Sequence, residues 1–206
     1  DAGASWTVVA VLSTYADAVF VDADVGWASG DMGTVKTTDG GATWAVVGLP
    51  GSANIPLGDG FANTTTGWVV GSNTSAGTMN KTTDGGTTWA SQAITAQILN
   101  GVAATSATNV IAVGQFGTVL RTNTGGTTWL SSVGGTYYHA VFANTTTGWM
   151  VGQSGTILKT TDAGVTWTGQ ASGTTLTLIK AYFADVNTGW AAGAAGVILA
   201  TTDGGT

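Results

Sequence analysis

The chain has 206 residues, of which 43% are hydrophobic, 8% are charged and 33 are glycines. Its net charge is -6, from eleven Asp, four Lys, one Arg and no Glu. It therefore lacks the clustered cations of a nucleic-acid or anionic-membrane surface. The absence of cysteine excludes disulfides, thiolate metal sites and cysteine nucleophiles. No apolar stretch approaches the ~20 residues of a membrane span. We expect one turn-rich domain with no nucleic-acid partner and no membrane insertion.

A unit of about forty residues recurs five times along the chain. Its clearest part is a turn phrase, which reads TTDGGATW from Thr37 and TTDGGTTW from Thr82. Further copies follow from Thr122 and Thr160. The chain opens with the second half of this phrase, DAGASW, and closes with its first half, TTDGGT. A period of this length is typical of a propeller blade.

Each unit contains four short β segments separated by turn residues. In the fourth unit they are YHAVFAN from Tyr138, WMVGQ from Trp149, TILKTT from Thr156 and TWTGQ from Thr166. No window has a convincing helical stripe of apolar residues. We predict a single all-β domain over residues 1–206, a five-bladed β-propeller of four-stranded antiparallel blades. The predicted blades span approximately residues 14–47, 55–92, 99–132, 137–170, and 178–206 together with 6–13.

The last blade is the one in which the two chain ends are expected to meet. We predict that the N-terminal strand, residues 6–13, completes it and leaves no open sheet edge. However, Asp1–Gly3 and Asp203–Gly205 represent the same turn twice. Two alternatives therefore stay open. The chain is a segment of a longer array, or its terminal strand completes the last blade of a neighbouring copy and builds a homopolymer.

The turn phrase D-x-G-x-x-W has a structural explanation. A glycine stands two residues after the Asp position in every copy, where a bulged hairpin turn needs a positive φ. The Asp carboxylate accepts hydrogen bonds from its own turn, and the Trp packs over the hairpin. The third unit departs from this pattern, with Thr124 in place of the Asp. We interpret these residues as structural: Asp1, Gly3, Trp6, Asp39, Gly41, Trp44, Asp84, Gly86, Trp89, Gly126, Trp129, Asp162, Gly164, Trp167, Asp203 and Gly205.

This phrase resembles the Asp-box, or BNR repeat, S/T-x-D-x-G-x-x-W. The longer pattern from Gly148 to Trp167 is similar to the photosystem II stability and assembly factor family. The resemblance covers nearly the whole chain and implies an Asp-box propeller. It also implies a platform that holds segments of membrane-protein partners, often through a basic patch. This chain has no such patch, so a photosystem role is not carried over.

Candidate binding residues lie away from the Asp-box turns. Those turns and the turns after the first strands are expected on one face, and the loops before the first strands and after the second strands on the other. Five equivalent positions near the start of the innermost strands ring the central channel: Asp17, Gly58, Gly101, His139 and Lys180. We predict a ligand site at this mouth and in the adjoining loops. Its candidate residues are Tyr15, Asp17, Asp31, Gln115, Gln153, Tyr137, His139 and Lys180.

The remaining charged residues suggest neither metal binding nor catalysis. Asp22 and Asp24 supply too few oxygens for a calcium loop, and we expect no metal and no cofactor. The cations before the Asp-box turns are interpreted as a solvated rim that pairs with nearby Asp: Lys36, Lys81, Arg121 and Lys159.

An enzyme is disfavoured by what the chain lacks. Resemblance to Asp-box sialidases would imply an arginine cluster and a Tyr/Glu pair, but Arg121 is the single arginine and Glu is absent. No Ser–His–Asp signature surrounds His139.

We expect a non-catalytic, extracytoplasmic binding or assembly module that presents the loops of one face to a protein partner. Low charge with abundant Thr and Gly favours a secreted bacterial protein, extracellular or periplasmic. Two alternatives are a lectin, in which repeated blades bind glycan multivalently, and a subunit of an extracellular filament or surface layer that shares its terminal strand.

Overall fold

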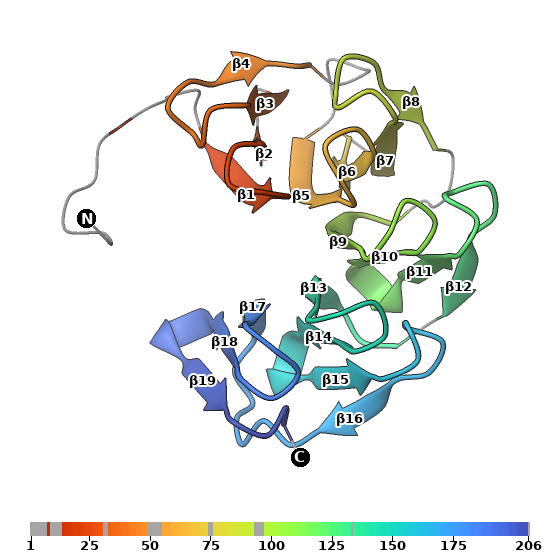
Figure 1. The fold of residues 1–206 in the computed structure, drawn as a ribbon. Coiled ribbons are helices and arrows are strands. Elements are labelled where there is room, and N and C mark those ends of the chain that lie inside the picture. The colour runs from red at the N-terminus through yellow and green to blue at the C-terminus, as the bar shows by residue number, and fades with distance from the viewer. Residues whose placement is uncertain are drawn as a thin grey trace.

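The computed structural model describes residues 8, 14–30, 33–48, 55–73, 76–92, 97–132 and 134–205. These residues form five antiparallel sheets arranged around a central axis, with one strand of each sheet facing the axis (Figure 1). The predicted all-β, five-bladed propeller is confirmed. Apart from three short 3-10 turns, the described residues contain no helix.

The strands of each blade follow one another in chain order from the axis outward. The first blade contains β1 (Tyr15–Phe20), β2 (Gly26–Gly30), β3 (Gly33–Thr37) and β4 (Ala45–Val46). The second contains β5 (Ile55–Phe61), β6 (Gly67–Ser72), β7 (Gly77–Thr82) and β8 (Ala90–Ser91). The third contains β9 (Leu99–Ala104), β10 (Val110–Gly114), β11 (Val119–Thr122) and β12 (Leu130–Ser132). The fourth contains β13 (Tyr137–Phe142), β14 (Gly148–Gly152), β15 (Ile157–Thr160) and β16 (Thr168–Gln170).

The fifth blade has three strands among the described residues, β17 (Leu178–Phe183), β18 (Gly189–Gly193) and β19 (Ile198–Thr201). The strand predicted to complete it, residues 6–13, lies outside the described residues except for Val8. Val8 is exposed and belongs to no strand.

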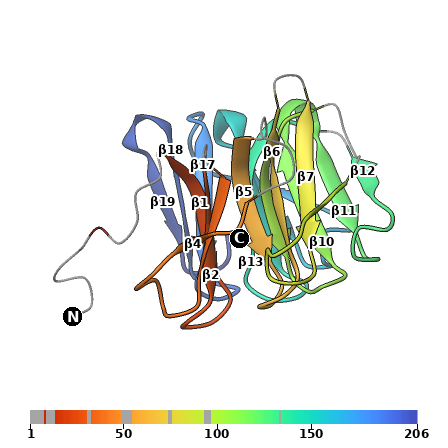
Figure 2. The same ribbon diagram turned by 90° about the horizontal axis from the view of Figure 1, so that it is seen from above.

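Two opposite faces collect the turns, because the strands run along the axis of the ring (Figure 2). On one face the Asp-box turn bonds the turn after the inner strand, as in Gly85 N–H to Thr65 O at 2.7 Å. On the other face the loop after the second strand bonds the loop before the first, as in Gln153 N–H to Thr136 O at 3.0 Å. We call these the Asp-box face and the loop face. The hydrogen bonds agree with the division of loops expected from the sequence.

The Asp-box turns are built as expected. Thr43 donates its N–H to Asp39 Oδ1 at 2.9 Å and its hydroxyl to Oδ2 at 2.6 Å, and Thr37 donates to Oδ1 at 2.8 Å. These hydrogen bonds, those from Thr43 first, lower the pKa of Asp39 to about 2. Thr124 keeps the same turn with its hydroxyl, which accepts the Thr128 N–H at 3.0 Å. The first copy, with Asp1, Gly3 and Trp6, lies outside the described residues.

Each joint between blades is closed by a bond to a main-chain carbonyl. Trp27 of the first blade stacks on Phe61 of the second, with ring centroids 3.6 Å apart, and its Nε1–H donates to Gly85 O at 3.2 Å. Trp149 makes the same two contacts with Phe183 and Gly204 in the fifth blade. Hydrophobic residues from adjacent blades fill the space around these contacts, and the core therefore lies between the blades.

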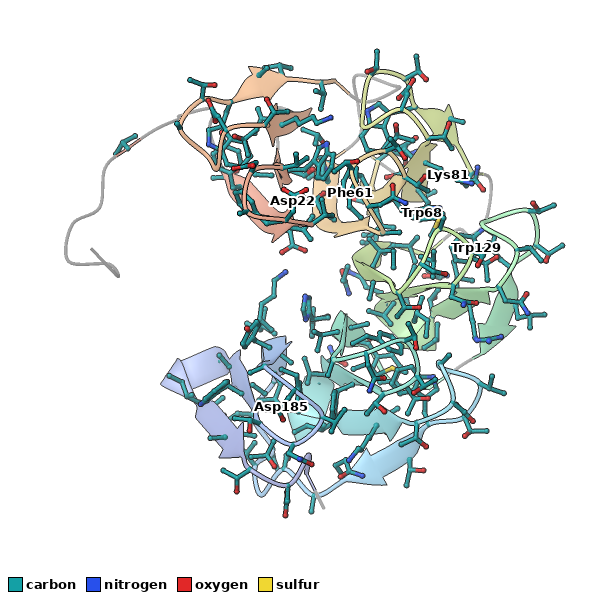
Figure 3. The ribbon with its side chains drawn as sticks, viewed as in Figure 1. Asp22, Phe61, Trp68, Lys81, Trp129 and Asp185 are labelled. Atoms are coloured by element: carbon teal, nitrogen blue, oxygen red, sulfur yellow. The ribbon has the colours of Figure 1, made fainter. Side chains whose placement is uncertain are left out.

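The cations before the turns are part of these joints, which corrects their interpretation as a solvated rim. Lys81 Nζ lies 5.3 Å from the Trp68 ring centroid and donates to Gly125 O of the next blade at 2.7 Å (Figure 3). Arg121 Nε donates to Ala163 O at 2.9 Å in the same way. A cation over an aromatic face is stabilised by the ring quadrupole. Among the described residues, no ion pair joins these cations to Asp.

Candidate functional site

Three of the predicted channel residues come together on the axis. Lys180 of β17 and Asp17 of β1 form an ion pair, with Nζ and Oδ1 2.7 Å apart. The pair connects the fifth blade to the first. It is the one ion pair within the described part of the chain, and the Asp17 side chain is the more buried partner.

His139 of β13 interacts electrostatically with both members of this pair. Burial lowers the pKa of His139 to about 4, and the positive charge of Lys180 lowers it further while Asp17 opposes the shift. His139 is therefore neutral at physiological pH. Its Nδ1 accepts the Ala181 N–H at 3.4 Å, a long hydrogen bond that leaves the proton on Nε2.

Two of the five equivalent positions are glycine for a steric reason. A Cβ on Gly58 would lie 2.8 Å from Gly101 Cα, and a Cβ on Gly101 would lie 3.0 Å from Tyr138 O. The inner strands of the second, third and fourth blades therefore approach one another backbone to backbone. The functional groups of Asp17, His139 and Lys180 are grouped where the fourth, fifth and first blades meet the axis.

Asp59 of β5 belongs to the same cluster but was missed by the sequence analysis. It is 5% exposed, and both carboxylate oxygens are buried. Burial raises the pKa of Asp59 to about 8, the charge of Asp17 adds to the rise, and the nearby Ser29 and Lys180 reduce it. Asp59 is therefore largely protonated at neutral pH.

A polar patch inside the first joint surrounds Asp59. The hydroxyls of Ser29 and Thr34 lie 2.7 Å apart and are fully buried. The equivalent residues of the next joint, Val70 and Met79, are apolar. Comparing the next position along each inner strand would have revealed Asp59, because its counterparts in the other blades are Ala18, Val102, Ala140 and Ala181.

The cluster borders a channel cavity of about 540 Å³, lined by Asp17, Asp59 and His139. Turn residues of the Asp-box face, including Thr105 and Asn144, also line it. No group of three or more His, Cys, Asp or Glu in the described segments is arranged to hold a metal ion. The cavity wall offers the carboxylate of Asp17, which Lys180 holds, together with one neutral imidazole and one protonated carboxyl.

The other predicted site residues are scattered. Tyr15 is exposed at the start of β1, whereas Tyr137 is buried between the third and fourth blades, where its hydroxyl accepts the Gly135 N–H at 3.3 Å. Gln115 and Gln153 begin two 3-10 turns on the loop face, η1 (Gln115–Gly117) and η2 (Gln153–Gly155). Asp31 lies outside the described residues.

Phe116, at the centre of η1, is a second residue that sequence reasoning did not single out as a binding candidate. Its side chain is 76% exposed on the loop face, and its φ is +51°. Ser154 and Ala195 occupy the same position in the next two blades, with φ values of +55° and +53°. A positive φ is rare for a residue other than glycine, and an exposed aromatic side chain there has no packing role. The signal was an aromatic residue where the next two repeats place Ser154 and Ala195.

The sequence matches the family model PSII_BNR, described as photosynthesis system II assembly factor YCF48, over residues 2–137 and 131–206. The chain belongs to this family. In the part of the protein that the structure describes, no helix is long and apolar enough to cross a membrane.

Solved structures of this family have the same fold. The structure "YCF48 bound to D1 peptide" is 21% identical, with a TM-score of 0.53, and the alignment covers 94% of this chain and 79% of that one. YCF48 from Cyanidioschyzon merolae is 15% identical, with a TM-score of 0.51 and coverage of 96% and 98%. At these identities the likeness shows the fold alone. No curated protein matches the sequence.

Enzyme propellers are also similar in fold. The GH74 enzyme from Niastella koreensis is 17% identical, with a TM-score of 0.67, and the alignment covers 88% of this chain but 35% of that enzyme. The chain thus spans about a third of the enzyme's length. Fold likeness to such an enzyme does not transfer its chemistry, which depends on the residues of a site.

Proposed function

We propose that the chain is a non-catalytic protein-binding module of the assembly-factor type, located outside the cytoplasm in the extracellular or periplasmic space of a bacterium. The observation that carries the proposal is the family match over nearly the whole sequence. A similar propeller has been solved with a D1 peptide bound, which makes a peptide segment of a partner protein the natural ligand class.

The loop face is the proposed binding face. The Asp-box face is occupied by turns whose polar groups satisfy one another, as in the bonds from Thr43 to Asp39. The loop face exposes the larger apolar side chains, Phe116, Ile55 and Leu176, whereas those exposed in turns of the Asp-box face are Val165 and Val186. Large aromatic side chains dominate the binding energy of protein interfaces when a partner covers them. We infer that Phe116 is the main anchor.

The channel residues support a binding role over a catalytic one. Asp17 is held by Lys180, and His139 Nδ1 already accepts a backbone N–H. Asp59 is the group with a pKa nearest neutrality, but its carboxylate oxygens are buried. A general base must reach its substrate within hydrogen-bond distance, and no group in the cavity combines access with a suitable pKa.

A labelled D1 peptide tests this proposal. Its fluorescence anisotropy is measured against the wild-type protein, Phe116→Ser and Val165→Thr. Phe116→Ser introduces the residue found at position 154, and we expect it to weaken binding by about 30-fold, the effect of losing a strong anchor.

Val165→Thr is the matched control, because Val165 is an exposed apolar residue of the Asp-box turn in the fourth unit. It should leave binding unchanged. Weaker binding by Val165→Thr with unchanged binding by Phe116→Ser would assign the peptide to the Asp-box face and contradict the proposal.

A further inference from the structure

The charged side chains of the molecule are distributed unevenly between its two faces. Described turns of the Asp-box face contain Asp22, Asp24, Asp39, Asp84, Asp162, Asp185 and Asp203. These aspartates outnumber the four cations that precede the Asp-box turns, of which Lys81 and Arg121 donate to carbonyls inside the joints. The other charges that the structure describes belong to the inner strands: Asp17, Asp59 and Lys180. The Asp-box face therefore carries a net negative charge.

The loop face is uncharged wherever the structure describes it. Its loops lie before the inner strands and after the second strands. The turns η1 and η2 contain QFG and QSG, and η3 (Ala194–Gly196) contains AAG. The loop before β17 reads ASGTTLT over residues 171–177. A charged group brought against these loops finds hydroxyls, amides and apolar side chains, and no opposite charge.

Phe116 is displayed on this face by a turn that the surrounding main chain holds in place. Gln115 donates its N–H to Ile98 O at 3.0 Å, and Phe116 donates its own to Thr136 Oγ1 at 3.2 Å. Gly117 packs so closely on the loop before β13 that an added Cβ would clash with the main chain of that loop. The backbone of Phe116 is thus fixed before a partner arrives, which reduces the entropy lost on binding.

The exposure of Phe116 arises in the interior of the chain. The residue belongs to the third blade, which packs against the second blade on one side and the fourth on the other. Of the aromatic side chains that the structure describes, Phe116 is the most exposed, at 76%. On the described loop face, a partner therefore removes the most apolar surface from water by covering this side chain.

We propose that the loop face selects partner segments that are uncharged where they touch it and that place a large apolar side chain on Phe116. The proposal rests on the proposed function, which makes a peptide segment the ligand class. A charged side chain at this face would lose water without gaining an opposite charge, and charged segments are disfavoured for that reason. The amides of Gln115 and Gln153 can bond the uncharged main chain of the segment.

A phage-displayed library of random peptides tests the inference. The library is selected in parallel on the wild-type protein, Phe116→Ser and Gln153→Lys. Peptides enriched on the wild type should contain large apolar side chains and be depleted in Asp, Glu, Lys and Arg relative to the unselected library. These peptides should not be enriched on Phe116→Ser. Gln153→Lys adds a cation at an exposed position of the loop face, and it should enrich peptides that contain Asp or Glu.

Fluorescence anisotropy of an enriched peptide measures the salt dependence of its binding. The affinity for the wild type should change by about twofold or less between about 50 mM and about 500 mM NaCl, because no charge pair is present for salt to screen. Asp185→Asn is the matched control, since it removes a charge from the Asp-box face. Asn63 already forms the equivalent turn with the same pair of hydrogen bonds. This variant should bind the peptide like the wild type.

Folding of each variant is checked by circular dichroism and thermal unfolding. Phe116→Leu is the second variant at this position, because it keeps a large apolar side chain and should retain most of the binding. Enriched peptides that are charged and lose binding in Phe116→Ser would overturn this inference and leave the proposed function standing. Peptides that lose binding in Val165→Thr and not in Phe116→Ser would contradict both. A library that yields no peptide specific for the wild type would also overturn the inference.

Discussion

Lys180 and Asp17 lie 163 residues apart in the sequence, yet their side chains form an ion pair of 2.7 Å on the axis of the propeller. The pair ties the inner strand of the last blade to that of the first. It also sets the electrostatic environment of the two buried titratable groups beside it, His139 and Asp59.

Removal of the Lys180 charge should raise the pKa of His139. Burial and this positive charge together hold the pKa at about 4, so Lys180→Met leaves burial alone to oppose the charge of Asp17. His139 is the one histidine of the chain, which makes its ring protons easy to follow in an NMR titration. Lys180→Arg keeps the charge and should keep the low pKa. An unchanged titration in Lys180→Met would contradict the coupling.

Replacing the buried Asp59 should stabilise the protein at alkaline pH. With a folded pKa of about 8 and an unfolded pKa near 3.8, Asp59 keeps its proton in the folded state while the unfolded state loses it. Its contribution to the free energy of unfolding therefore falls as pH rises from about 4 to about 8 and then stays constant. At about 1.4 kcal/mol for each unit of pKa difference, the loss reaches several kcal/mol.

Urea unfolding of Asp59→Ala and the wild type at several pH values measures this loss. The variant carries the residue found at positions 140 and 181. The free energy of unfolding of the variant should exceed that of the wild type by an amount that increases up to about pH 8. His139 acts in the opposite direction between about pH 4 and 6.5, because its folded pKa is lowered, so stability from this group rises with pH there. Because both proteins contain His139, its contribution cancels in the difference between their free energies of unfolding. A difference that does not vary with pH would contradict the buried carboxyl.

Ala163 carries backbone strain that a glycine would relieve. Its φ is +59°, and Gly40, Gly85 and Gly125 occupy the same position of other Asp-box turns with φ values of +68°, +73° and +67°. We expect Ala163→Gly to stabilise the folded state by about 0.5 to 1 kcal/mol. A left-handed conformation costs an L-residue about 1 to 2 kcal/mol, and the added flexibility of the unfolded chain offsets part of that gain. The midpoint of urea unfolding measures it.

The reverse change is the control for this prediction. A Cβ on Gly125 would lie 3.0 Å from Ala107 O, and Gly125→Ala should therefore destabilise the protein. Equal midpoints for both variants and the wild type would mean that the position carries no strain.

Completing the third Asp-box should stabilise the chain at neutral pH and not in acid. Thr124→Asp supplies the carboxylate that Asp84 and Asp162 use to accept two hydrogen bonds from a threonine of the turn. Such hydrogen bonds lower the pKa of these aspartates to about 2. The stabilisation should be present above about pH 4 and disappear as pH falls through 2. Thermal unfolding at pH 7 and pH 2 checks this, and an equal gain at both values would contradict the mechanism.

Much of the fold was predictable because the same pattern of strands and turns recurs five times in the sequence. Each copy of the turn phrase predicts a hairpin. The glycine two residues after the Asp, as at Gly86 and Gly164, predicts the position where φ is positive. The contacts between blades were harder to predict. Lys81 was interpreted as a solvated cation, since nothing in its own repeat reveals that the carbonyl of Gly125 lies beside it in the next blade.

The candidate site was predictable where it follows from equivalent positions in the repeats. Asp17, His139 and Lys180 share one position and do meet at the axis, where two of them form an ion pair. Asp59 lies one position further along its strand, where it is buried beside the first joint, and a comparison restricted to the preceding position therefore overlooked it.

The joints rely on the main chain of the blade that accepts the bond. The carbonyls of Gly85, Gly125, Ala163 and Gly204 accept the bonds whatever side chains surround them, and the donor side is met by Trp, Lys or Arg. This hydrogen bond can therefore be kept when a blade is duplicated or mutated at its surface, while the side chains packed between the blades still have to fit one another. This gives a lineage of such proteins a simple route to new loop faces, in which whole repeats are copied and their loops diversify afterwards.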